Sequence, residues 1–107
     1  MPVKFNQDEQ LKCPICGDGY LHQSLVEVYQ RDGEDAPKGF AVSVDYPSMK
    51  LETSQAENPS RRRSGIRIYF LCENCEERYE GNNYPLMSLI IIQNKGNTYI
   101  EWEDLCR

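Results

Sequence analysis

The sequence carries Cys13-Pro14-Ile15-Cys16-Gly17 near its start and Cys72-Glu73-Asn74-Cys75 well beyond its middle. Zinc is held by four ligands in a tetrahedron, and thiolates are among its preferred ligands. Pro14 stiffens the first turn, and Gly17 follows it where the backbone often takes a positive φ. Backbone N–H groups in such a turn can point at the sulfurs and offset their charge. We therefore predict one structural Zn²⁺ held by Cys13, Cys16, Cys72 and Cys75.

Other uses of four cysteines are weighed against zinc. Disulfides need an oxidising compartment, and the start of the chain carries no secretory signal. A thioredoxin-like redox pair belongs in a βαβ setting, and no helical pattern follows either pair. An iron–sulfur cluster also uses four cysteines, so iron and disulfides stay as alternatives. We expect the fifth cysteine, Cys106, to be a free thiol near the end of the chain.

Length and charge limit the partners that the chain can have. Its 107 residues suit one domain, 1–107, and with 39% hydrophobic residues we expect a modest core that a metal cross-link supports. No apolar run approaches the roughly 18 residues of a membrane span, and we expect a cytoplasmic protein. The net charge is −5, and the excess of acidic side chains lies in residues 1–60. An acidic chain repels phosphate backbones at long range, which weighs against nucleic acid as a partner.

Alternating apolar and polar side chains predict an all-β chain without helices. We expect strands over residues 20–30, 40–46, 66–71, 86–93 and 98–103, with turns over residues 31–39 and 94–97. The run 86–93 is the most apolar, and we interpret it as the central strand, covered on both faces. In the last strand, Ile100 and Trp102 should point inward. Residues 47–64 show no hydrophobic period and contain two prolines, which predicts a mobile loop.

Together these features predict a small antiparallel sheet of two or three β-hairpins. The zinc-binding turns lie beside the hairpins, and a long insertion separates the two cysteine pairs, because the usual spacing between such pairs is about 15–20 residues.

Four stretches resemble a group of small phage and bacterial zinc-ribbon proteins of unassigned function. They are Cys13-Pro14-Ile15-Cys16-Gly17, Asn58-Pro59-Ser60-Arg61-Arg62, Gly65 to Cys75, and Gln93-Asn94-Lys95-Gly96-Asn97-Thr98 ending at Trp102. The resemblance implies a β fold and a metal site. It transfers no activity, and the long insertion departs from the compact ribbon.

Enzyme chemistry finds little support in the sequence. The only histidine is His22, so a mechanism that needs two histidines is excluded. A zinc deaminase needs His-x-Glu with Pro-Cys-x-x-Cys, and neither motif is present. A catalytic zinc keeps an open coordination position, whereas four cysteines close the shell. We expect a non-enzymatic protein in which His22 is an ordinary strand side chain, and no small-molecule substrate is evident.

Two kinds of binding partner stay open. A rigid sheet with long loops and exposed edges suits recognition of another protein, which we favour. The alternative is nucleic-acid binding through Arg61, Arg62, Arg63 and Arg67, because arginine pairs with phosphate and the neighbouring Tyr69 and Tyr79 could stack on bases. The run of three arginines is shorter than the basic runs typical of such patches.

Overall fold

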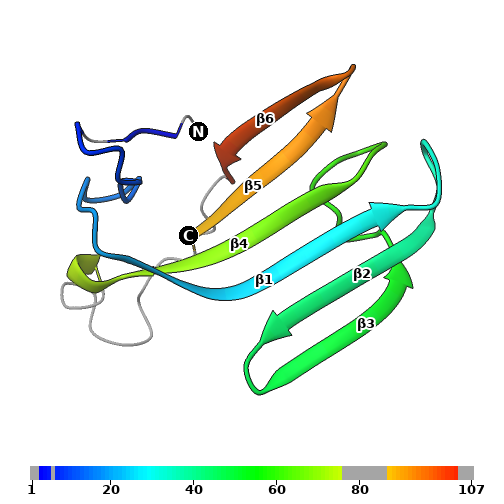
Figure 1. Cartoon of the computed structure of the whole chain (residues 1–107), viewed down its shortest axis with the longest axis horizontal. Helices are drawn as coiled ribbons and strands as arrows, with labels where there is room; N and C mark the ends of the chain where they lie inside the picture. Colours follow the sequence, from blue (N-terminus) through cyan, green and yellow to red (C-terminus); the bar gives the residue numbers. More distant parts are fainter. Residues whose placement is uncertain (1–2, 6, 76–86, 104–107) are drawn as a thin grey trace.

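The computed structural model describes residues 3–5, 7–75 and 87–103, and these form a six-stranded antiparallel sheet (Figure 1). The strands are β1 (Leu21–Arg31), β2 (Lys38–Asp45), β3 (Ser48–Ser54), β4 (Gly65–Cys72), β5 (Met87–Asn94) and β6 (Asn97–Trp102). Their order across the sheet is β3-β2-β1-β4-β5-β6. The all-β prediction is confirmed. Within the described ranges, no helix has the length and apolar character needed to cross a bilayer.

The two central strands are the ones that adjoin the cysteine pairs. β1 starts shortly after Cys16, and β4 ends at Cys72. The two strands are antiparallel neighbours, with Leu21 opposite Cys72 at one end and Val28 opposite Ile66 further along. β2 and β3 continue the sheet beyond β1, while β5 and β6 continue it beyond β4 (Figure 1). The long insertion between the cysteine pairs is therefore an integral part of the sheet.

Strand β3 corrects the assignment of residues 47–64 to one loop. Residues 48–54 pair with β2, from Ser48 opposite Asp45 to Glu52 opposite Ala41. All seven β3 residues are exposed. Because only Met49 and Leu51 in this strand are large and apolar, its own sequence carries a weak signal, and hydrogen bonding to β2 supplies the stability.

β5 and β6 differ in two respects from expectation. β5 lies between β4 and the edge strand β6, so its predicted place at the centre of the sheet is wrong. Its first four residues, 87–90, are buried on both faces, as predicted for this run. In β6, Trp102 is buried and meets Phe70 edge-on, with ring centroids 5.6 Å apart. Ile100 is 52% exposed, which contradicts its predicted inward position.

The burial of Trp102 and the exposure of Ile100 have one cause. The main core cluster lies at the cysteine end of the sheet, where Phe70, Met87, Leu89 and Trp102 pack with the buried cysteines. Val3, Leu11 and Ile15 from the N-terminal segment pack against this cluster, and Figure 1 shows that segment at the same end of the sheet. Ile100 lies further along the same face, beyond the part that the N-terminal segment covers.

The hairpin between β5 and β6 has the turn that its sequence predicts. Asn94 pairs with Asn97, which leaves Lys95 and Gly96 as the two turn residues. Their φ angles are 51° and 81°, so both adopt the left-handed conformation of a type I′ turn. Gly96 takes this conformation without steric cost, as expected.

Candidate metal centre

Four cysteine sulfurs gather at one end of the sheet. Cys13 and Cys16 precede β1, Cys72 ends β4, and Cys75 belongs to a helical turn that begins at Glu73. All four sulfurs lie within 4.8 Å of one another. The Cys13 and Cys75 sulfurs are 3.7 Å apart, and those of Cys16 and Cys72 are 3.5 Å apart. The prediction that these four residues meet is confirmed.

The spacing of the sulfurs suits a shared metal ion. Zn–S bonds of about 2.3 Å in a tetrahedron place neighbouring sulfurs about 3.8 Å apart, close to the observed values. A disulfide would need about 2.05 Å, and the four cysteines are free thiols. The cluster can therefore hold one metal ion, and both tetrahedral zinc and iron suit four sulfur ligands.

The first Cys-x-x-Cys turn has the backbone geometry that its sequence predicts. Gly17 has a φ of 80°, and its N–H donates to the Cys13 carbonyl at 2.9 Å. The Ile15 N–H points at the Cys13 sulfur at 3.4 Å, and the Asp18 N–H points at the Cys16 sulfur at 3.5 Å. Both bonds favour thiolate over thiol, because each places a positive N–H dipole beside a developing negative charge.

The second pair is buried more deeply than the first. Cys72 and Cys75 have no exposed surface, Cys13 is 3% exposed, and only Cys16 is half-buried. The helical turn at residues 73–75, which the sequence pattern did not indicate, turns the chain so that Cys75 comes back beside Cys13. Three of the four cysteines are thus held in the buried interior.

Burial affects the ionisation of three of the four thiols. Burial raises the pKa of Cys72 to about 11, and burial together with its sulfur neighbours raises the pKa of Cys75 well above its usual value. Burial also opposes ionisation of Cys16, but hydrogen bonds from the Asn74 side chain and the Asp18 backbone lower its pKa to about 7. Burial thus opposes ionisation of the second pair, and a cation bound at the site would supply the charge that four thiolates require.

His22 lies outside the sulfur cluster. Its Nε2 is 2.8 Å from Oε1 of Glu73, and both side chains are exposed. This hydrogen-bonded pair links β1 to the second cysteine turn at the surface. Cys106 and Tyr79 fall outside the described residues.

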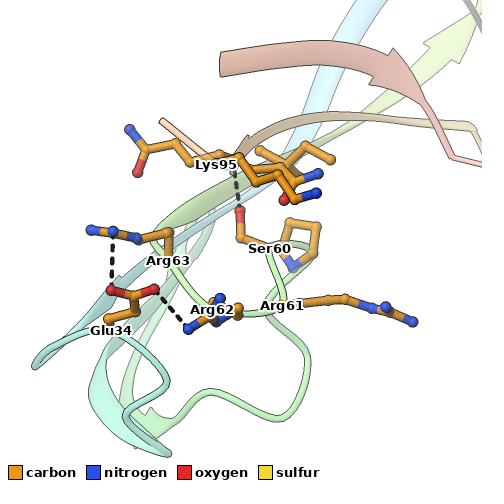
Figure 2. A pocket seen from close by; sticks show the side chains of 10 residues that line it. Glu34, Ser60, Arg61, Arg62, Arg63 and Lys95 are labelled. Atoms are coloured by element: carbon orange, nitrogen blue, oxygen red, sulfur yellow. Dashed lines mark hydrogen bonds and ion pairs between the residues drawn. The ribbon is translucent and has the colours of Figure 1, made fainter. Parts of the chain in front are cut away.

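The predicted arginine run lines a surface pocket of about 420 Å³ (Figure 2). Arg62 pairs with Asp35 at 2.7 Å and with Glu34 at 2.8 Å, and Arg63 pairs with Glu34 at 3.1 Å. Figure 2 shows the Glu34 carboxylate between the Arg62 and Arg63 guanidinium groups, while the Arg61 side chain extends away from it. The acidic loop between β1 and β2 therefore neutralises part of the run.

Arg67 is separated from the other three arginines. Its side chain is 11% exposed and forms ion pairs with Glu103 at 2.6 Å and Glu27 at 3.1 Å. These hydrogen bonds more than offset burial, so the pKa of Arg67 is raised. Through these ion pairs Arg67 links β4 to β1 and to Glu103. It does not join Arg61, Arg62 and Arg63 in one surface.

Arg31 has a structural role that the sequence analysis missed. Its guanidinium donates hydrogen bonds to the carbonyl oxygens of Ala36, Ser60, Arg61 and Arg63. The residues around Ser60 are also anchored, because the Ser60 Oγ accepts from the Gln93 N–H and donates to the Ser64 carbonyl. Arg31 is the last residue of a strand, and no pattern near it could reveal partners some 30 residues away.

Comparison with known proteins leaves the chain without an assigned relative: no protein-family model, curated protein or solved structure matches it.

Proposed function

We propose that the protein is a non-enzymatic binding module, stabilised by one structural zinc ion, that recognises another protein. The observation that carries the zinc assignment is the set of four sulfurs at near-tetrahedral spacing. Four cysteine ligands leave the ion no open position for a water or a substrate. The free thiols fit a reducing compartment such as the cytoplasm.

The edge of the sheet supports a protein partner. β3 is an edge strand, and all seven of its residues are exposed. An edge strand presents unpaired backbone N–H and C=O groups, with which an extended segment of another protein can pair. Lys50 and Glu52 project from the polar face of β3, where they can select the charges of that segment.

The internal pairing of the arginines supports a protein partner over nucleic acid. The Arg67 side chain is largely buried and forms ion pairs with two carboxylates, so it is not available to bind phosphate. The pairs that Arg62 and Arg63 form are exposed to solvent, which screens them, so they are weaker than the pairs of Arg67. With Arg67 in ion pairs of its own and Glu34 and Asp35 beside Arg62 and Arg63, the run keeps little net positive charge to overcome the repulsion from a chain of net charge −5.

A pair of proline variants tests the edge-strand proposal. Consecutive strand residues point their N–H groups to opposite sides, so one of Lys50→Pro and Leu51→Pro removes an outward N–H and the other removes one that faces β2. The inward variant should melt at a lower temperature. The outward variant should keep the wild-type melting curve.

Partners are captured from lysate with wild type and with the stable proline variant, and each candidate is then purified and titrated directly. We expect a partner that binds wild type and binds the stable variant at least about tenfold more weakly, since the added strand loses a main-chain bond. Equal binding of every partner to both proteins contradicts recognition through β3.

Titration of labelled single-stranded DNA and RNA at about 50 and 200 mM salt tests the alternative. We expect no measurable binding by the zinc-loaded protein at the lower salt concentration. Binding that weakens steeply with salt and disappears in Arg61/Arg62/Arg63→Ser would replace the protein partner with nucleic acid.

A further inference from the structure

Two rows of side chains on one face of the sheet are apolar from edge to edge. The first row runs Met49, Val44, Val26, Ile68, Leu89 and Trp102 across all six strands. The second row runs Leu51, Val42, Val28, Ile66, Ile91 and Ile100 in the same strand order. No charged side chain interrupts either row.

The opposite face has a different chemistry. The row between these two runs Lys50, Ser43, Glu27, Arg67, Ile90 and Glu101, and its charged members project from the other side of the sheet. Arg67 forms its ion pairs there. The anchored residues around Ser60 also pack on that side, because a Cβ on Gly65 would meet Asn58 and Ser60.

The apolar face is only partly covered in the described structure: of its twelve residues, five are exposed, five are half-buried and two are buried. The N-terminal segment covers only the cysteine end, where Leu89 and Trp102 are buried. At the other end of the rows, Met49 is 75% exposed and Leu51 is 66% exposed. Val44, Val28 and Ile100 are exposed as well, and Phe40 extends the patch beyond the second row.

The open area lies at the upper end of what a monomer usually leaves. From their exposed fractions, these six side chains present on the order of 600 Å² of apolar surface, at the upper limit of about 300–600 Å² for the largest patch on a monomer. With the half-buried residues of the two rows, the face approaches the roughly 800 Å² that each partner contributes to a standard interface. The radius of gyration is 14.9 Å, against about 13 Å for a compact domain of this length, as expected where the described strands form one sheet without a second sheet packed on it.

We propose that a second copy of this chain covers the apolar face, so that two sheets stack face to face into a β-sandwich. The face needs an occupant without charges, and the chain itself offers such a surface of matching extent. Homodimer interfaces are more apolar than other interfaces and are depleted of charge at their centre. A two-fold axis through the face lets each row meet apolar side chains of the other copy, at the spacing of about 10 Å that stacked sheets adopt.

Charge placement and composition favour a second copy over a segment of the same chain. Stacking puts Glu27, Glu101 and the other charges of the polar face on the outside of the dimer, where repulsion between the acidic copies is screened by solvent. The longest stretch outside the description, 76–86, contains four charged residues among its first five, which suits water better than an apolar face. The dimer also leaves the β3 edge accessible, so this inference stands apart from the proposed protein partner.

Sedimentation equilibrium of the zinc-loaded full chain tests the proposal. We expect a species of about 25 kDa, twice the 12.4 kDa of one chain, as a two-fold dimer requires. Val44→Lys places a charge in the first row, and its matched control Ser43→Lys places the same charge on the adjacent residue, which faces the other side. We expect Val44→Lys to raise the dimer dissociation constant at least about 100-fold, because two charges per dimer enter an apolar interface. Ser43→Lys should leave it within about twofold of wild type, because the half-buried Ser43 lies on the polar side of the sheet, outside the interface.

Met49→Lys is the second variant. Because the Met49 side chain is highly exposed in the monomer, we expect this variant to fold normally. It should also weaken the dimer while keeping the wild-type circular dichroism spectrum and metal content. A wild-type monomer at about 100 μM would overturn the proposal, since an interface of this size associates well below that concentration. An edge-paired dimer that neither Val44→Lys nor Met49→Lys weakens would overturn it as well.

Discussion

Replacing Cys72 by serine should remove the metal and most of the stability of the fold. The Cys72 sulfur is fully buried, 3.5 Å from the Cys16 sulfur. Serine offers a poor ligand for zinc, and its hydroxyl would be left in a site lined by sulfur and apolar groups. We expect the purified variant to contain less than half a zinc ion per chain, against one in wild type.

The size of the effect follows from the length of the loop that a metal at this site would close. A metal ion at this site would join residues 56 to 62 positions apart in the sequence. For a cross-link that closes a loop of about 60 residues, the chain-entropy relation gives roughly 4 kcal/mol of stabilisation. This is a large share of the roughly 5–15 kcal/mol that stabilises a domain. A loss of about 4 kcal/mol should lower Tm by at least 15 °C or so in a domain of this size.

The assay combines metal analysis with thermal unfolding followed by circular dichroism, and Cys106→Ser is the matched control. The control makes the same chemical change at the one cysteine outside the cluster, and it should keep one zinc ion per chain and the wild-type Tm. Chelation of the wild-type protein should reproduce the Tm of Cys72→Ser, since both remove the same cross-link. A Cys72→Ser protein with a full zinc ion and an unchanged melting curve would refute the assignment of the metal site. One iron in place of zinc, with visible absorption, would keep the four ligands and change the metal.

Three further predictions concern the sheet and its polar face. Gly65→Ala should lower the free energy of unfolding, measured by chemical denaturation, by about 1–3 kcal/mol. The new Cβ would lie 2.5 Å from the Asn58 Oδ1 and would force the two atoms apart. An unchanged denaturation midpoint would show that this close approach is absent. Arg67→Ala should lower the free energy of unfolding by about 2–3 kcal/mol. This is less than the 3–5 kcal/mol expected for a fully buried pair, because Glu103 keeps 31% of its side chain in solvent. A loss of less than about 0.5 kcal/mol would contradict a stabilising role. Burial opposes ionisation of Glu103, but hydrogen bonds from Arg67 and Ser88 hold its pKa below the usual value. The ionised carboxylate therefore stabilises the fold at pH values above the unfolded pKa of about 4.3. This stability is lost as the pH falls through the lower pKa of the folded state. Stability measured from pH 6 to pH 3 should therefore fall less steeply in Glu103→Gln than in wild type, and equal slopes would speak against this linkage.

The sequence determined the parts of the protein that depend on near neighbours. Two cysteines three residues apart are brought together by local turn geometry, which is why the four-cysteine cluster could be predicted before the fold was known. The alternation of side chains revealed five of the six strands, because burial on one face repeats every second residue. The turn at Lys95 and Gly96 is also determined locally, because these two residues can adopt the positive φ angles that the turn requires.

The tertiary structure decided what depends on residues far apart in the chain. β3 forms because β2 offers it a ladder of backbone hydrogen bonds, and its own exposed residues show little sign of this. Arg62, Arg63 and Arg67 look like a basic surface in the sequence, but carboxylates from other segments lie against them in the structure. The exposure of Ile100 depends on how far the N-terminal segment extends over the sheet. Each of these outcomes is a balance of burial and charge between segments, and such a balance exists only once the segments have been brought together.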